Sequence, residues 1–304
     1  MDKVHFPYRS DSHLPFLHVV GESGSWEKHG LEVEYDYFIS ADDAHKNVAD
    51  GSVEFVGGNH VSTYGKRTRG DRWVYLAQSV SLLNHRLVAR PEAGISKVAD
   101  LRGKVIGSRG EHPGLNTWLF LKQNGLDGAV ETVRIRSKGE ALWAAVRDKK
   151  VDAAFVTPPA DLFARRAGLK VIDVDFLPMV WFTTVSSGLP FVEKHPDIVD
   201  KFLRGIIEGI AYFKTRRNES IKIIQNRYKG EGDLDQEAAT HLYEDLAKIL
   251  QARPYASVQA ISNVYEISKK QDPAAENVEP MSLWNFHYLR RIDDSGFIEN
   301  LYKK

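Results

Sequence analysis

Residues 53–65 read VEFVGGNHVSTYG, and this stretch decides the fold. Its short apolar run, Val53 to Val56, is typical of a buried strand, and the glycine pair after it predicts a tight turn into a helix. Ligands of open α/β sheets bind beyond the carboxyl ends of the strands, so we expect Asn59, His60 and Ser62 to line a ligand site. The alternative is that the glycines form only a turn and that Asn59 or Ser62 caps the helix.

The composition is that of a folded protein without a dominant charge. The chain has 304 residues, and its 41 lysines and arginines equal its 41 aspartates and glutamates. No global field therefore recruits nucleic acid or an acidic membrane. The chain has no cysteine, which excludes thiolate nucleophiles, cysteine metal sites and disulfides. We find no ligand spacing typical of a metal site and no phosphate-cradling glycine motif, so we predict neither a metal nor a cofactor.

The amino terminus, Met1–Tyr8, enters a strand-like run without the apolar region or cleavage site of an export signal. No later stretch approaches the length of a membrane span, so we predict no membrane insertion. The sequence as given predicts a cytoplasmic protein. A trimmed mature form would begin in the same way and would be periplasmic.

The chain before the opening stretch follows the same pattern of strand, polar loop and helix. Val4 to Phe6 predict a first strand, and a helix begins at Leu14. The loop between them would form a second wall of the ligand site. Its candidate ligand-binding side chains are those of Arg9, Asp11 and His13.

The pattern repeats in the middle of the chain. Residues 100–108 predict a turn and a strand, and the loop 109–114 precedes a helix. A buried strand over 151–156 leads to Thr157, which ends its strand as His60 does. Two such halves predict two α/β lobes that face each other across a cleft and close by hinge motion on a ligand. We place lobe I, with the C-terminal helices, at 1–88 and 186–304, and lobe II at 89–185.

Two side chains have the most definite expected roles. Arg109 follows a strand and is suited to hold a carboxylate or sulfonate, because a guanidinium binds such oxygens bidentately; the alternative is a solvated surface arginine. His60 is a hydrogen-bonding wall, a general acid or base, or a buried structural group, and its place at a strand end favours the first two. The predicted ligand-binding residues are Arg9, Asp11, His13, Asn59, His60, Ser62, Arg109, Glu111, His112, Thr157 and Trp181.

Four parts of the chain resemble a known family: 14–17 with 26–33, 48–55, 98–107 and 191–199. The stretch VADLRGKVIG at 98–107 is the most diagnostic, since it matches the opening of the family's second lobe. Together they resemble the type II periplasmic-binding-protein fold, in the branch of nitrate-, sulfonate- and taurine-type solute-binding proteins and the fungal thiamine-pyrimidine synthase. The resemblance covers nearly the whole chain and implies an α/β fold of two lobes with a ligand cleft between them.

The resemblance leaves two functions open. The first is a small-molecule-binding protein for an anionic or aromatic organic ligand, of the type that feeds an ABC transporter permease. The second is a cytosolic, cofactor-independent lyase, decarboxylase or hydrolase in which His60 moves a proton, because His60 falls where the synthase and an aromatic sulfinate desulfinase of this fold carry a functional histidine. The cysteine chemistry of those two enzymes cannot be carried over, since this chain has no cysteine. We prefer the binding protein.

Overall fold

The chain divides into two compact units. The computed structural model describes residues 1–58, 60–108, 111–135, 141–228 and 234–303. Unit 1 comprises Met1–Leu82 and Pro178–Lys304, and unit 2 comprises Leu83–Leu177. The two crossings lie within β5 (Leu82–Leu83) and β11 (Leu177–Pro178), which pair with each other. The sequence prediction places the crossings six and eight residues further along, at 88/89 and 185/186.

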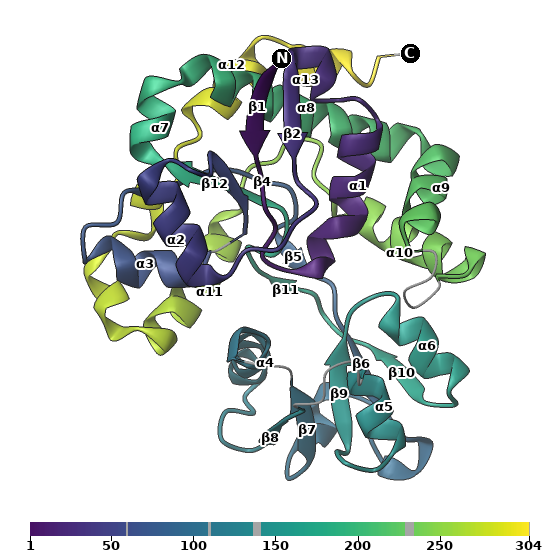
Figure 1. Cartoon of the computed structure of the whole chain (residues 1–304). Helices are drawn as coiled ribbons and strands as arrows, with labels where there is room; N and C mark the ends of the chain where they lie inside the picture. The colour runs from purple at the N-terminus through teal and green to yellow at the C-terminus, as the bar shows by residue number, and fades with distance from the viewer. Residues whose placement is uncertain (59, 109–110, 136–140, 229–233, 304) are drawn as a thin grey trace. The chain divides into compact units, whose positions relative to one another are not determined.

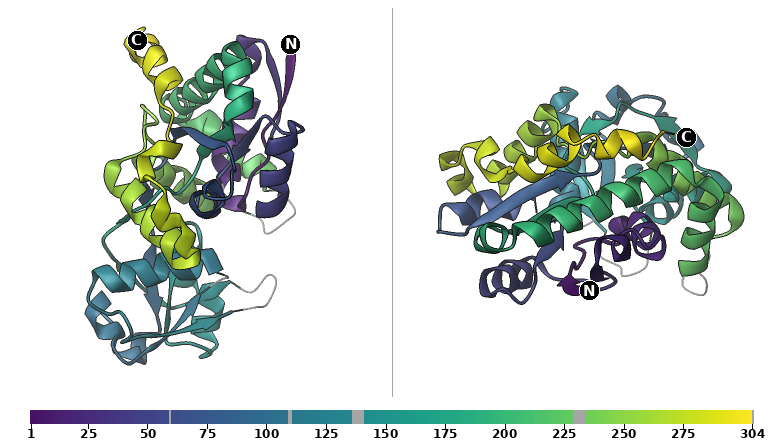
Figure 2. Two further views of the ribbon diagram at one scale, coloured as in Figure 1. Left: turned by 90° about the vertical axis from the view of Figure 1, so that its left-hand side faces the viewer. Right: turned by 90° about the horizontal axis from the view of Figure 1, so that it is seen from above.

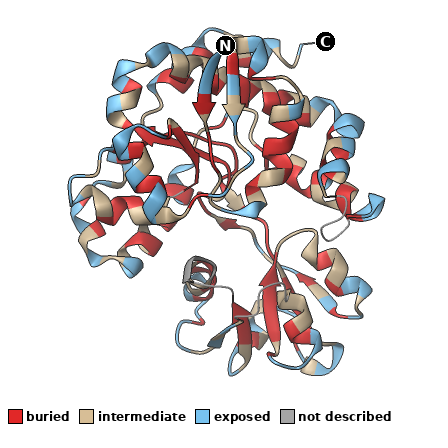
Figure 3. Cartoon of the chain, viewed as in Figure 1, coloured by how far each residue is buried: buried red, intermediate tan, exposed pale blue. Residues whose placement is uncertain are grey.

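Unit 1 is built on strands that run together near its centre (Figure 1). A parallel pair joins β1 (Asp2–His5) to β2 (Leu31–Glu34). Beside it, β12 (Thr184–Gly188) lies between β3 (Phe55–Gly57) and β4 (Trp73–Gln78) and is antiparallel to both. All residues of β4 and β12 are buried, which the red strands of Figure 3 show. The hydroxyl of Ser186 in β12 has a hydrogen-bond partner in this buried position, since its Oγ donates to the Val56 carbonyl at 2.9 Å.

Helices cover these strands. Local sequence sets several of their ends: the Ser40 hydroxyl accepts from the Asp43 N–H at 3.1 Å and caps α2, which ends at Gly51 with a φ of 80°. The helices of unit 1 are α1 (Leu14–Glu22), α2 (Ala41–Asp50), α3 (Ser62–Arg67), α7 (Leu189–Lys194), α8 (Pro196–Thr215), α9 (Arg217–Arg227), α10 (Gln236–Ile249), α11 (Val258–Gln271), α12 (His287–Asp294) and α13 (Phe297–Asn300). Short 3-10 turns, η1 (Asp11–His13), η2 (Glu27–His29), η5 (Pro273–Asn277) and η6 (Pro280–Leu283), join some of them.

Helix α8 holds the core of unit 1 together. Figure 2 shows it running between the N-terminal segments, in purple, and the yellow C-terminal helices, and it packs against α1, η2 and α12. Phe202 on α8 is fully buried. Its ring stacks on Phe55 of β3 at 4.0 Å and on Trp26 at 5.6 Å, and meets Phe6 edge-on at 4.9 Å. One aromatic side chain thereby fixes the strands that lead into the loops after β1 and β3.

Unit 2 is a five-stranded sheet in the order β10-β6-β9-β7-β8. Its parallel part, β9-β7-β8, is joined to an antiparallel edge made by β6 and β10. The strands are β6 (Arg86–Ala89), β7 (Val105–Ser108), β8 (Glu131–Arg134), β9 (Ala153–Val156) and β10 (Lys170–Asp173). The helices and 3-10 turns are α4 (Glu111–Gln123), α5 (Leu142–Arg147), α6 (Ala160–Arg166), η3 (Pro91–Ala93) and η4 (Val98–Leu101). Val88, Ala145, Val146 and Ala154 form its apolar centre.

Candidate functional site

The loop after β1 continues the sheet of unit 1 beyond the strand. The Gly57 N–H donates to the Pro7 carbonyl at 2.8 Å, and the Arg9 N–H donates back to the Gly57 carbonyl at 3.1 Å. On the other side of the loop, the Tyr8 N–H donates to the Tyr37 carbonyl at 3.0 Å. The loop is therefore fixed between the ends of β2 and β3, and it holds Arg9 at the carboxyl ends of these strands, where open α/β sheets bind ligands.

Gly58 makes the close approach of this loop feasible. Its φ of 118° lies in the region that side chains rarely adopt. A Cβ at Gly58 would lie 3.1 Å from Arg9 Cβ and 3.5 Å from His13 Cε1. The glycine pair is thus more than the turn that the sequence predicts, because it brings Arg9 and His13 against the end of β3.

We expect Gly58→Ala to lower the free energy of unfolding by about 1–3 kcal/mol, the cost of a strained backbone position. Gly70→Ala is the matched control, because Gly70 has a φ of 92° and a Cβ there would meet no described atom within 4 Å. Urea denaturation of both variants separates backbone strain, which they share, from crowding against Arg9. Equal losses in the two variants would show that the crowding has no effect.

The side chain of Arg9 is half-buried, and its guanidinium already makes one hydrogen bond and one contact to an aromatic ring. Its Nη1 donates to the Ile39 carbonyl, and the group lies 5.6 Å from the ring centre of Phe38. Its Nε is buried and has no hydrogen-bond partner in the described part of the chain. Burial lowers the pKa of Arg9, while Asp42 and Asp43 raise it. Since an arginine stays protonated at neutral pH, Arg9 places a cation with an unused donor at these strand ends.

His13 ends η1 and is only 3% exposed. Burial, assisted by the nearby charge of Arg9, lowers the pKa of His13 to about 3. The imidazole is therefore neutral at pH 7, and an anion at this site would be met by the charge of Arg9. Nδ1 of His13 is buried and finds no partner among the residues that the structure describes. Buried polar atoms are normally hydrogen-bonded, so this nitrogen is a further candidate contact for a ligand.

The protonation of His13 predicts a pH dependence of stability. The unfolded chain takes up a proton near pH 6.5, whereas the folded chain does so only near pH 3. Stability should therefore be complete above pH 6.5 and fall as the pH drops toward 3, by up to about 1.4 kcal/mol per pH unit. Urea denaturation between pH 4.5 and 7.5 measures the slope. We expect His13→Gln to flatten it, and a variant with the wild-type slope would contradict the buried neutral state.

Aromatic and polar groups from the segment before β12 join the same cluster. Phe182 lies 5.9 Å from His13, ring centre to ring centre, and Trp181 lies 5.9 Å from Phe182. The Thr183 carbonyl accepts from the Ser79 N–H at 3.0 Å, and the buried hydroxyl of Thr183 finds no partner in the described chain. Together with Arg9, His13 and Phe38, these residues form what we call the Arg9 site.

Several predicted site residues lie elsewhere or outside the described residues. Asp11 is exposed and raises the pKa of Tyr8, after the larger effect of burial. His60 is half-buried beyond β3, and its carbonyl accepts from the Tyr75 hydroxyl at 3.2 Å. Ser62 begins α3 and hydrogen-bonds to His45 Nε2 at 3.1 Å. Asn59 and Arg109, and the side chains of Glu111 and His112, are outside the part of the chain that the structure describes.

A family model with the description "NMT1/THI5 like" matches residues 12–220, which is more than half of the chain. The chain belongs to the NMT1/THI5-like family. The match spans most of the Arg9 site, from His13 through the glycine pair to the segment before β12, and begins three residues after Arg9. Comparison with curated protein sequences found no match.

Solved structures resemble this NMT1/THI5-like protein over nearly its whole length. A putative periplasmic sulfonate-binding protein SsuA from Methylobacillus flagellatus KT is 14% identical, with a TM-score of 0.73, covering 100% of this chain and 97% of that one. The periplasmic aliphatic sulphonate binding protein SsuA from Escherichia coli is 15% identical, with a TM-score of 0.67 and coverages of 93% and 99%. The protein DSZB, solved with biphenyl-2-sulfinic acid, is 15% identical, with a TM-score of 0.63 and coverages of 97% and 99%. The predicted periplasmic-binding-protein type II fold is confirmed.

Unit 2 of this NMT1/THI5-like protein has buried polar groups of its own. The ring of His85 is buried between Phe120, at 4.5 Å, and Phe155, at 4.8 Å. Burial lowers the pKa of His85 to about 4, and its Nε2 finds no partner within the described residues. The buried hydroxyl of Ser108, at the end of β7, likewise finds no hydrogen-bond partner within the described residues. Thr157, after β9, is half-buried. His85 and Ser108 are thus candidate polar contacts that belong to unit 2.

Sequence reasoning about this NMT1/THI5-like protein missed Phe182, Thr183 and Ser79. The stretch Trp181–Val185 reads as one strand, but β12 begins only at Thr184. Residues 181–183 instead run beside the end of β4, where the Trp181 N–H donates to the Val80 carbonyl at 3.2 Å. All five residues of 181–185 are of types common in strands, so the sequence does not indicate that the strand begins only at Thr184.

Two further features concern metals and membranes. Among the described residues, no group of three or more histidines and acidic side chains is placed to hold a metal ion. None of the described helices has both the length and the apolar character that crossing a membrane requires.

Proposed function

We propose that this chain is a small-molecule-binding protein of the solute-binding type, whose ligand is a small organic anion with an apolar or aromatic part. The observation that carries the proposal is the Arg9 site. There, a half-buried cation with an unused Nε, a neutral buried imidazole and the rings of Phe182 and Phe38 lie around one set of strand ends. An arginine suits the oxygens of a sulfonate or carboxylate, and the rings suit the rest of the molecule.

The comparisons support the ligand class. The Methylobacillus and Escherichia coli structures are named as sulfonate-binding proteins, and DSZB was solved with a sulfinic acid. The ligands in these names combine an anionic group that contains sulfur with an organic part. By this analogy of fold we include an ABC transporter permease as the partner and the periplasm as the location in the proposal.

The proposal is tested by isothermal titration calorimetry with a panel of alkanesulfonates, arylsulfonates, carboxylates and matched neutral sulfonamides and amides. We expect saturable binding of at least one anion at a stoichiometry of one, and at least tenfold weaker binding of its neutral counterpart. If the neutral compounds bind as tightly as the anions, the ligand is not held by its charge and the proposal fails.

His60 separates binding from the enzymatic alternative that the sequence leaves open. A binding protein should not convert the tightest-binding compound of the panel into any product. His60→Asn should then change the protein's affinity for that compound by only about 0.5–1.5 kcal/mol, the net contribution of one hydrogen bond. A general acid or base at this position would make product in the wild type, about 10²–10⁴-fold faster than in the variant. Mass spectrometry of the incubated compound measures the product made by the wild type and by the variant. Product from the wild type alone would show that the protein is an enzyme and not only a binding protein.

A further inference from the structure

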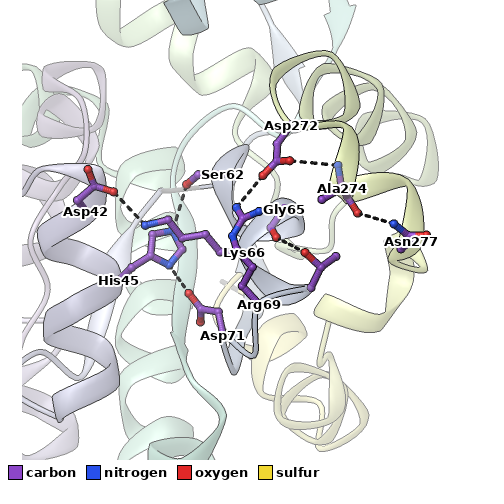
Figure 4. A network of polar contacts seen from close by, with 11 residues as sticks. Asp42, His45, Ser62, Gly65, Lys66, Arg69, Asp71, Asp272, Ala274 and Asn277 are labelled. Carbon is purple, nitrogen blue, oxygen red and sulfur yellow. Dashed lines mark hydrogen bonds and ion pairs between the residues drawn. The ribbon is translucent and has the colours of Figure 1, made fainter.

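A second polar cluster in unit 1 is formed by residues that the Arg9 site does not use. Asp71, which precedes β4, lies with its Oδ2 at 2.5 Å from His45 Nδ1. On the other side of the ring, His45 Nε2 lies 3.1 Å from the Ser62 hydroxyl. Figure 4 shows Asp71 and Ser62 on opposite sides of the imidazole of His45, which is contributed by α2. We call these three residues the Ser62 triad.

The tautomer of His45 decides the direction of both hydrogen bonds. When Nδ1 carries the ring proton, it donates to the carboxylate of Asp71, which accepts. Nε2 is then the acceptor, and the Ser62 hydroxyl donates to it. A serine that donates to an imidazole whose other nitrogen is held by a carboxylate is the arrangement that activates serine nucleophiles, and it recurs on unrelated folds.

The ring of His45 is held firmly and borders a cavity. His45 is 6% exposed and packs on Trp73 with ring centres 4.7 Å apart. The cavity has a volume of about 1120 Å³ and lies wholly in unit 1, with His45, Lys66 and Asp71 among its lining residues. It is large enough for a small organic molecule.

Lys66 lines this cavity one helical turn from Ser62, which is not itself among the lining residues. Both residues belong to α3 and are four positions apart, so their side chains lie on one face of the helix. The Lys66 ammonium lines the cavity and lies 2.9 Å from Asp42 Oδ1. Ser62 itself is half-buried. A cation one turn from the serine is suitably placed to stabilise negative charge that develops on an attacked carbonyl oxygen.

We propose that the Ser62 triad is a nucleophilic acyl-transfer site that hydrolyses small carboxylic esters. This activity is separate from ligand binding at the Arg9 site, because it uses none of the residues of that site. Ser62 is the nucleophile, His45 is the general base, and Asp71 is the positioning residue that holds the required tautomer of His45.

The reaction needs only the ester and water. Ser62 Oγ bonds to the ester carbonyl carbon while its proton passes to His45 Nε2. The bond from that carbon to the alcohol oxygen then breaks, and the alcohol leaves with the proton from His45. Water, deprotonated by His45, attacks the acyl group on Ser62; the carboxylic acid is released and the proton returns to Ser62 Oγ. Asp71 keeps its hydrogen bond to His45 Nδ1 throughout.

The direct test is covalent labelling of the full chain with a fluorophosphonate, which reacts with activated serines. We expect one adduct in the intact mass and its assignment to Ser62 by peptide mass spectrometry. We also expect hydrolysis of 4-nitrophenyl acetate with an initial burst of 4-nitrophenol. If the wild type shows no adduct on Ser62 under excess reagent, the proposal is overturned, and this outcome does not depend on whether any variant folds.

Variants assign the roles. Ser62→Ala should abolish the adduct, and Asp71→Asn should slow labelling and hydrolysis about 10²–10⁴-fold, as a wrong tautomer of the general base does. Ser52→Ala is the matched control, because Ser52 bonds to Asp50 at 2.7 Å and to the Asn47 carbonyl at 3.3 Å but to no histidine. Hydrolysis that persists unchanged in Ser62→Ala would overturn the proposal. Neither result bears on binding at the Arg9 site, which calorimetry reports independently.

Discussion

Replacing Phe202 by alanine is expected to lower the free energy of unfolding by about 3–5 kcal/mol, the cost typical of deleting a buried aromatic side chain. The size of the effect follows from its position. Phe202 is fully buried and contacts Phe55, Trp26 and Phe6, which come from three separate segments. The alanine would leave a cavity that these rings cannot all close at once. Urea denaturation of wild type and variant measures the difference.

Phe38→Ala is the control for this loss. Phe38 is 57% exposed, so the same chemical change should cost much less stability there. Phe202 also orders the strands that precede the Arg9 loop, so we expect Phe202→Ala to weaken ligand binding as well. A Phe202→Ala protein as stable as Phe38→Ala would show that α8 does not hold the core in the way described.

Arg9→Gln should weaken binding of the anionic ligand by about 1.5–3 kcal/mol, the worth of a hydrogen bond to a charged group. This corresponds to a loss of about 10–150-fold in affinity, since about 1.4 kcal/mol is a factor of ten. Glutamine keeps a hydrogen-bonding edge but lacks the charge. Calorimetry with the tightest compound of the panel measures the change, and a thermal melt checks that the lost contact to the Ile39 carbonyl has not unfolded the loop.

Two controls sharpen this result. Arg9→Lys keeps the charge but loses the guanidinium fork, so its affinity should fall between those of wild type and Arg9→Gln. Arg72→Gln removes the same charge from an exposed side chain that pairs with Glu193 at 3.4 Å and should leave the affinity unchanged. If Arg72→Gln weakens binding as much as Arg9→Gln, the effect of Arg9 is only that of net charge.

Local features were predicted well because their causes are local. Of the predicted strand Val53–Val56, Phe55 and Val56 lie in β3, which extends to Gly57, and Ser40 caps α2 as serines before helices commonly do. The fold class follows from the order of such elements along the chain, and it is confirmed by the solved structures. Arg9 and His13 were also selected from sequence, because a polar loop between a predicted strand and a predicted helix marks a strand end.

The rest of the Arg9 site and the Ser62 triad depend on contacts between distant residues. Phe182 meets His13 across 169 positions of sequence. Ser62 was expected to face a ligand at the strand end, yet its hydroxyl bonds to His45, which lies in a helix with no chemical motif of its own. Single-sequence patterns report periodicity and turns, and they carry no information on which side chains of two such segments meet.

The most direct test of the account is a crystal structure of the protein with the tightest anion of the calorimetric panel. The account predicts that the anionic group lies within hydrogen-bond distance of the Arg9 guanidinium and that the organic part contacts Phe182 or Phe38. An anion held elsewhere, with no contact to the Arg9 guanidinium, would contradict the claim that the Arg9 site binds the ligand.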